Sequence, residues 1–231
     1  MRTTDPKGRS ARSRALRHGA DRGARGHARK PVGATRAEKS EARRQAIVAA
    51  ALDEFCTRGF AATRLDDVAR RAKVAKGTIY LHFRDKQALF QEIVGTMLVP
   101  LRAVLEAPPP DVPLRQVLER FVDTFVREIY STERRNVLRL VMTEGPRFPE
   151  LAEFYYRNVV ERAIAAMRAL LTRAKARGEL KDDTLIRFPQ LIVAPGMMAI
   201  IWSGLFERFA PLDVAAMMRA HVAALLEGAA P

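Results

Sequence analysis

The clearest chemical signal in the sequence is a short run of side chains that can bind anions, between Lys76 and His82. The run combines a lysine, a threonine, a tyrosine and a histidine with Gly77. All four side chains can donate hydrogen bonds to phosphate oxygens, and a glycine lets a partner approach the backbone closely. We therefore interpret the run as a surface for nucleic-acid phosphates. No single residue in it indicates which bases would be recognised.

Side chains suited to catalysis or to metal binding are sparse. The histidines stand at positions 18, 27, 82 and 221, too scattered for metal-ligand spacing. The single cysteine, Cys56, excludes an internal disulfide framework, and beside Phe55 we interpret it as a buried apolar thiol. Neither a nucleophile paired with a base nor a phosphate-binding glycine loop occurs. We expect no enzymatic activity, no metal and no cofactor.

Positive charge is concentrated at the beginning of the chain. The 231 residues carry 40 Lys and Arg against 26 Asp and Glu, a formal net charge of +14. Residues 1–40 hold 12 basic and 3 acidic residues, residues 41–90 hold 10 and 6, and residues 91–231 hold 18 and 17. This asymmetry predicts that the N-terminal part contacts a polyanion, with nucleic acid as the leading candidate, while the remainder is an ordinary soluble body.

Residues 1–40 are predicted to be a disordered basic tail. Apart from Leu16 and Val32 they hold almost no large apolar residue, so they cannot bury enough surface to offset the entropy of ordering. Such a tail would add non-specific attraction to DNA phosphates. No apolar run suits a secretory signal, and we expect a cytoplasmic protein. An organellar transit peptide, or a start codon placed too far upstream, stays open as an alternative.

Residues 41–88 are predicted to form a DNA-binding domain that starts with two helices. Apolar residues recur at helical spacing over residues 41–58, and Gly59 followed by a phenylalanine marks the end of this helix. Thr63 stands three residues before an aspartate, which is the spacing of a capping box. It predicts a second, short helix over residues 64–72.

A third short helix follows a tight turn and carries the anion-binding run. Ile79 and Phe83 are four residues apart, so both can point into the core while Lys76, Tyr80 and His82 face elsewhere. Two short helices joined by a tight turn and braced by a longer helix are typical of a helix-turn-helix.

Residues 89–231 are predicted to form a larger helical body. A fourth helix that continues through Leu89, Met97 and Leu101 would join head and body, and the prolines at 108–110 would end it. Further amphipathic helices are predicted over residues 113–130, 133–143, 148–178, 184–206 and 211–228. Because no strand-like alternation and no internal repeat occur, the sequence predicts an all-α fold.

The segment from Phe188 to Phe206 is nearly free of charge and long enough to raise a membrane span as an alternative. Pro189, Pro195 and Gly196 interrupt it. A helix that is apolar all round is more often buried, in this case between the core and a second subunit. The last helix supplies a matching face for a four-helix dimer interface: Val214, Met218, Val222 and Leu225.

Methionine and aromatic side chains in the body are candidates for an apolar ligand cavity, because methionine adapts to irregular shapes and aromatic rings offer broad contact. They are Met142, Phe148, Tyr155, Tyr156, Met167, Met197, Met198 and Trp202. Possible polar anchors are Arg139, Glu144, Asn158 and His221. Each of these side chains has an ordinary alternative role in the core, in a helix cap or in a salt bridge.

The run TRLDDVARRAKVAKGTIYLHFRDKQALF, residues 63–90, resembles the DNA-binding segment of TetR/AcrR-family transcriptional regulators. Its K-G-T-I-Y-x-H-F core, followed by a charged turn and a lysine, carries the likeness. Residues 143–151, TEGPRFPEL, are similar to a stretch in the effector domains of one branch of this family. The resemblance implies an all-helical homodimer with a three-helix DNA-binding head and a larger helical body that binds a small molecule.

Carried onto this chain, the motif implies a set of DNA-binding residues: Thr63, Arg64, Lys76, Gly77, Thr78, Tyr80, His82 and Lys86. Two positions depart from the pattern, because many members have glycine in place of Lys73 and serine in place of Ala75. A glycine would take a left-handed turn cheaply, and a serine would cap the recognition helix and could reach a phosphate.

The resulting hypothesis is a dimeric regulator, a repressor in the first instance, that binds a palindromic DNA operator. A small hydrophobic or aromatic effector would release it by binding one of two states more tightly. An activator of the same architecture, and a non-specific basic DNA-coating protein, are the alternatives.

Overall fold

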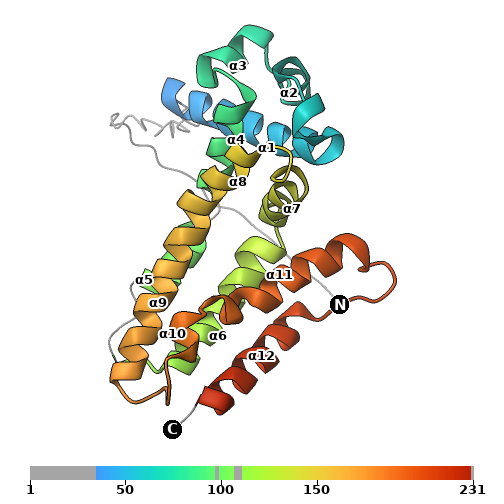
Figure 1. Ribbon diagram of the computed structural model, residues 1–231. Helices are drawn as coiled ribbons and strands as arrows, with labels where there is room; N and C mark the ends of the chain where they lie inside the picture. Colours follow the sequence, from blue (N-terminus) through green and yellow to red (C-terminus); the bar gives the residue numbers. More distant parts are fainter. Residues whose placement is uncertain (1–34, 97–98, 107–110, 230–231) are drawn as a thin grey trace, which may run out of the picture. The chain divides into compact units, whose positions relative to one another are not determined.

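The computed structural model describes residues 35–96, 99–106 and 111–229 (Figure 1). Contacts divide the chain into residues 1–35 and residues 36–231, and every described helix belongs to the second unit. The described residues form helices and no strands, which confirms the predicted all-α fold. Most of the predicted tail lies outside the described residues.

The first four helices build the helix-turn-helix head. They are α1 (Arg36–Ala62), α2 (Leu65–Arg71), α3 (Lys76–His82) and α4 (Lys86–Gly95). α1 begins five residues earlier than predicted, because residues 36–39 are good helix formers and no glycine or proline occurs in residues 36–40. Gly59 has the non-helical angles φ 78° and ψ 161° and divides α1 at a kink. The long part of the helix therefore ends at Gly59 as predicted, and a short helical segment follows it to Ala62.

The turn between α2 and α3 holds the head in shape. Lys73 has φ 56°, the left-handed conformation for which many relatives of this pattern use glycine. Ala75 is the N-cap of α3 and offers no side-chain hydrogen bond. The capping box predicted at Thr63 is wrong, because Arg64 is the N-cap of α2 and makes no side-chain cap. The Thr63 hydroxyl instead donates to the backbone of α1.

The predicted single helix between head and body is two helices. α4 ends at Gly95, where the Thr96 hydroxyl donates to the Ile93 carbonyl, and α5 covers Val99–Glu106. Pro100 explains the separation, since proline is tolerated in the first turn of a helix and restricts the residue before it. Met97 lies outside the described residues.

The body contains seven α-helices besides α5 and two short π-helical turns in the described residues (Figure 1). The turns, Val126–Tyr130 and Tyr156–Val160, continue α6 and α8 without a break. The helices are α6 (Leu114–Phe125), α7 (Arg134–Glu144), α8 (Pro149–Tyr155), α9 (Glu161–Ala176), α10 (Thr184–Arg187), α11 (Gln190–Leu205) and α12 (Val214–Ala229). These bounds match the predicted amphipathic segments to within a few residues, except that 184–206 is divided at Phe188 and Pro189.

One apolar core runs from the head into the body. α1 packs against α7, and α4 packs against α8. At this junction the Phe60 ring lies 5.2 Å from the Phe148 ring, centroid to centroid. The predicted boundary at residue 88 therefore lies within a continuous set of packed side chains. Because close-packed side chains transmit strain, a displacement of α7 or α8 would also displace residues of the head.

Two further expectations are tested by the described residues. No described helix is both long enough and apolar enough to cross a membrane, and α11 has 16 residues. Cys56 is exposed, contrary to the expectation of a buried thiol. Partial desolvation of the sulfur, and then the carboxylates of Asp53 and Glu133, raise the pKa of Cys56 to about 11, so the thiol stays protonated at neutral pH.

Candidate nucleic-acid interface and ligand cavity

A buried carboxylate fixes α2 against α1. Glu54 is only 4% exposed, and its Oε1 lies 2.6 Å from Arg71 Nε while its Oε2 lies 3.2 Å from Arg58 Nε. The hydrogen bond that Arg71 Nε donates to the Glu54 carboxylate raises the pKa of Arg71. Because a buried carboxylate needs its cationic partners, the Glu54–Arg71 pair defines how α2 sits on α1, whereas the Arg58 pair lies within α1. α2 in turn positions α3, which packs against it.

An ion pair joins α2 to the first residue of α3. Lys76 Nζ lies 2.7 Å from Asp66 Oδ2, and both side chains are exposed. This hydrogen bond, together with the charge of Asp66, raises the pKa of Lys76, so the ammonium remains charged. A phosphate could take the place of Asp66, since exposed pairs of this kind contribute little to stability.

α3 presents one buried face and one open face. Ile79 and Phe83 are buried as predicted, which confirms the pairing of these two residues in the core. Tyr80 is 50% exposed, while Thr78 and His82 are half-buried at the edges of the helix. The open face therefore offers hydroxyl, ammonium and imidazole groups, the donors that proteins use for phosphate oxygens.

Three predicted DNA-binding residues lie outside α3. Arg64 is exposed at the start of α2. Thr63 is 2% exposed, and its hydroxyl donates to the carbonyls of Glu54 and Gly59, so this hydroxyl does not reach solvent. Lys86 Nζ donates to two carbonyls at the end of α1, each at 2.8 Å. The structure thus brings Arg64 and the α3 residues to the surface, and it ties Thr63 and Lys86 to the backbone of α1.

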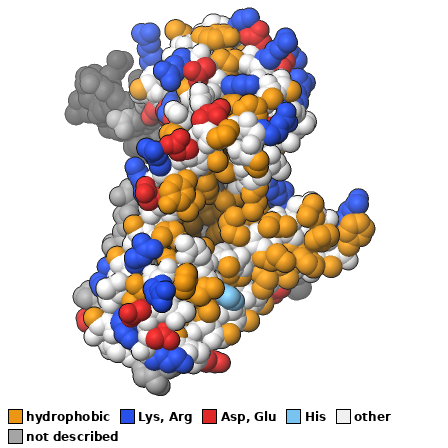
Figure 2. Space-filling model, viewed as in Figure 1, with side chains coloured by type: hydrophobic (Ala, Val, Ile, Leu, Met, Phe, Trp, Pro, Cys, Tyr) orange, Lys and Arg blue, Asp and Glu red, His pale blue; other side chains and the backbone are white. Residues whose placement is uncertain are grey.

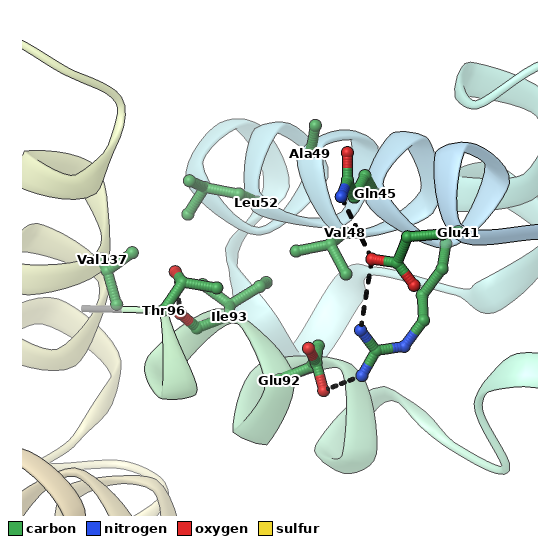
Figure 3. A pocket seen from close by; sticks show the side chains of 10 residues that line it. Glu41, Gln45, Val48, Ala49, Leu52, Glu92, Ile93, Thr96 and Val137 are labelled. Carbon is green, nitrogen blue, oxygen red and sulfur yellow. Dashed lines mark hydrogen bonds and ion pairs between the residues drawn. The ribbon is translucent and has the colours of Figure 1, made fainter. Parts of the chain in front are cut away.

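A small cavity of about 270 Å³ lies where α1 meets α4 (Figure 3). Its apolar side is formed by residues of α1, α4 and α7: Val48, Leu52, Ile93 and Val137. At its polar rim, Arg44 Nη2 lies 2.5 Å from Glu92 Oε2 and joins α1 to α4. The cavity thus marks the place where the head meets α7 of the body.

A larger cavity of about 610 Å³ lies in the body, and Figure 2 shows a hollow with hydrophobic walls between α9 and α11. Its walls come mainly from α6, α9 and α11 and from the π-helical turn after α8. None of its described lining residues is charged, and the polar side chains among them are Tyr155 and Gln190. Burial raises the pKa of Tyr155, so its hydroxyl remains protonated and can both donate and accept.

Half of the methionine and aromatic residues singled out in the sequence line this cavity. Tyr155, Met167, Met197 and Met198 line it. The others do not: Phe148 packs on Phe60, Met142 and Tyr156 are exposed, and the Trp202 indole donates to the Ala210 carbonyl at 2.6 Å. Lining residues that sequence reasoning missed include Phe121, Phe125, Val159, Ile164 and Val193. The helical spacing of these residues indicated an apolar face, but it could not show whether that face lines a cavity or packs in the ordinary core.

The candidate polar anchors lie elsewhere. Arg139 Nη2 donates to Ser203 Oγ at 2.8 Å and thereby joins α7 to α11. Asn158 donates to a backbone carbonyl of its own helix, and the His221 ring lies 2.7 Å from the Leu191 carbonyl oxygen. Glu144 is buried at the end of α7 and packs against Gly59. A β-carbon added to Gly59 would lie only 3.0 Å from Glu144 Oε1.

The face of α12 predicted for dimerisation is mostly buried inside the single chain. Val214, Met218 and Val222 lie in the core against α6 and α11, and Leu225 is half-buried. Exposed apolar side chains occur instead along α11 and the turn that follows it, and Figure 2 shows them as a continuous hydrophobic strip. They are Leu191, Met197, Met198, Ile201, Leu205, Phe206 and Phe209, which we call the α11 strip.

Comparisons with known proteins agree with this architecture. Residues 47–93 match the family described as bacterial regulatory proteins, tetR family, and residues 108–220 match the tetracyclin repressor-like C-terminal domain. The HTH-type transcriptional regulator AcrR of Shigella flexneri is 32% identical over 204 residues, covering 82% of this chain and 90% of AcrR. The HTH-type transcriptional repressor BepR of Brucella suis biovar 1 is 32% identical over 154 residues, covering 64% of this chain and 73% of BepR.

Solved structures agree as well. Salmonella enterica GusR superposes with a TM-score of 0.65 at 26% identity, covering 80% of this chain and 96% of that one. The chain spans 66% and 41% of the length of two further curated relatives. The superposition on GusR shows that both the head and the helical body have counterparts in a solved structure.

Proposed function

This chain belongs to the TetR family of bacterial transcriptional regulators, and from this premise we propose that it is a homodimeric repressor that an uncharged, hydrophobic or aromatic effector releases from a palindromic operator. The observation that carries the proposal is the pairing of an exposed recognition helix with a large apolar cavity in one chain. Regulation of transcription by DNA binding is the family's activity, so neither an enzyme nor a non-specific DNA-coating protein is favoured.

The DNA interface that we propose is the open face of α3 with the start of α2. Lys76, Tyr80 and Arg64 would bind phosphates on both sides of a major groove, with Thr78 and His82 at the edges of the same helix. Thr63 and Lys86 would act indirectly, because their polar groups fix the end of α1 against the start of α2 and α4. Two heads of a dimer would meet half-sites about 34–36 Å apart.

The α11 strip is the surface that we propose for the dimer. Its exposed large apolar side chains follow one helix and the turn after it, and such a patch is unusual on a monomer. The side of α12 that stays accessible, including half-buried Leu225, would complete a four-helix interface with two helices from each chain.

The lining of the 610 Å³ cavity supports an uncharged effector. A charged group would lose its hydration without meeting an opposite charge among the described lining residues. Tyr155 and Gln190 offer hydrogen bonds to a hydroxyl or carbonyl group on an otherwise apolar compound. Because Met197 and Met198 belong both to the cavity and to the α11 strip, effector binding and dimer geometry would be linked through α11.

Selection of fragmented genomic DNA by the purified full chain, at near-physiological salt, tests the proposal. Enrichment of a few inverted repeats, lost when a binding effector is added, is the expected result. A control variant without residues 1–34 should lose some affinity but enrich the same repeats, because the helices of the head begin at Arg36. Enrichment of no sequence by either protein would contradict a specific repressor.

A further inference from the structure

The outermost face of the recognition helix carries no charge. Ile79 marks the buried side of α3, and positions two residues away on an α-helix point about 200° round, almost opposite to it. Those positions are Gly77 and Leu81, one helical turn apart on the same face. Leu81 is 85% exposed, more than any other exposed large hydrophobic residue of the described chain.

Gly77 has no explanation within the chain itself. Its backbone is helical rather than left-handed, and a β-carbon added to it would meet nothing within 4 Å. Neither conformation nor internal packing therefore requires glycine, although glycine destabilises a helix relative to alanine. Close approach of an external partner to this side of α3 is the remaining physical reason for a residue without a side chain.

We propose that Leu81 contacts the 5-methyl group of a thymine in each operator half-site, and that Gly77 leaves the room for the base pair to approach. The proposal rests on the proposed function, since it takes α3 to be the helix in the major groove. A leucine side chain has no hydrogen-bonding group, so it can distinguish bases only by apolar contact. The thymine methyl is the apolar group that the major groove displays.

The side chains next to this face are suited to phosphate contacts, whereas Leu81 is suited to a base contact. Tyr80 and Thr78 flank the Gly77–Leu81 face, and Lys76 precedes it. These polar groups can bind the two phosphate backbones on either side of the groove, which leaves the centre of the face for base edges. Leu81 would thus determine sequence preference at one position, whereas the phosphate contacts would act on all sequences alike.

The first experiment compares the sequences that wild type, Leu81→Ala and Leu81→Met enrich from a randomised duplex DNA library. We expect wild type to enrich an inverted repeat with a fixed thymine in each half. Leu81→Ala should lose the preference at that position and keep the other positions, while Leu81→Met, which preserves apolar reach, should retain it in part. Met142→Ala is the matched control, since it removes an exposed apolar side chain from α7.

The second experiment replaces the selected thymine by deoxyuridine, which removes only the methyl group. Wild type should lose about fourfold in affinity for each half-site changed, the value of one buried methylene-sized group, and Leu81→Ala should lose none. All variants should unfold at the wild-type temperature, because Leu81 is exposed. Equal losses for both proteins, or an unchanged motif in Leu81→Ala, would overturn the assignment. Enrichment of no motif by wild type would instead count against the proposed repressor.

Discussion

Lys76 Nζ lies 2.7 Å from Asp66 Oδ2, so the first residue of the recognition helix is already paired with a carboxylate of α2. DNA would have to displace this carboxylate, whose negative charge also repels phosphates. We predict that Asp66→Asn binds DNA about three- to tenfold more tightly at low salt, with a smaller gain at high salt. Fluorescence anisotropy with the selected operator measures this.

Glu227→Gln serves as a control for the loss of one negative charge, because Glu227 is exposed on α12. It should change the affinity by much less than Asp66→Asn does. Weaker DNA binding by Asp66→Asn would mean that the carboxylate is needed to orient Lys76.

Lys76 and Tyr80 should affect DNA binding in different ways. Loss of a cation that touches a phosphate reduces the number of released counterions, so Lys76→Ala should weaken binding to all sequences and lower the slope of log K against log salt by about 1. Tyr80→Phe removes a neutral donor and should weaken binding with little change of slope. Titrations at four salt concentrations separate the two effects, and wild-type affinity in both variants would contradict their roles.

The left-handed backbone at Lys73 should cost stability. A side chain with a β-carbon is disfavoured at φ 56°, so Lys73→Gly should raise the free energy of unfolding by about 1 kcal/mol. Lys73→Ala keeps the β-carbon and should leave stability nearly unchanged, which separates backbone strain from loss of charge. Urea unfolding followed by circular dichroism measures the difference, and equal stability of the two variants would contradict a backbone origin.

The cavity in the body can be filled without touching the head. Ala163 lines it from α9, and Ala163→Phe should occupy part of the 610 Å³ volume. We expect effector affinity to fall at least tenfold, while affinity for the selected operator stays within twofold of wild type. Calorimetry with a compound found by thermal-shift screening of uncharged aromatic compounds provides the measurement. Undiminished effector binding would place the effector elsewhere.

Most of the head could be predicted from the sequence because local signals mark its helices. Gly59 ended the first helix by its positive φ, and the spacing of Ile79 and Phe83 identified the buried side of the third. The break between α4 and α5 was missed because apolar periodicity continues across it, although Pro100 was a local signal. The capping box at Thr63 failed because its hydroxyl found backbone partners on α1 instead.

The body was harder to predict for a different physical reason. Periodicity shows which side of a helix is apolar, but a core, a cavity and an interface all require an apolar side. Met218 was therefore assigned to a dimer face, although it lines the cavity of its own chain. Met197, predicted for the ligand cavity, does line the cavity of the body, but the helix that carries it is apolar all round, so periodicity alone could not show which side faces the cavity. Deciding among these roles needs the positions of all neighbouring helices.

The hydrogen bond between Arg139 and Ser203 offers a test of how the effector could act on the head. α11 lines the cavity, α7 packs against α1, and the Arg139 guanidinium joins α7 to α11 with a nitrogen–oxygen distance of 2.8 Å. If this bond transmits the movement of α11, its loss should reduce coupling between effector and operator. Coupling free energies of this kind are about 1–3 kcal/mol, a factor of roughly 5–150 in affinity.

We predict that Ser203→Ala binds the effector and the operator separately with affinities within threefold of wild type, but that the effector no longer weakens operator binding by the wild-type factor. Because linkage is reciprocal, the operator should equally lose its effect on effector affinity in the same variant. Measuring both ratios distinguishes lost coupling from lost binding at either site. Ser131→Ala, an exposed serine outside this contact, is the control and should keep both ratios. Full effector response in Ser203→Ala would show that coupling passes through the packed contacts of α7 and α8 with the head instead.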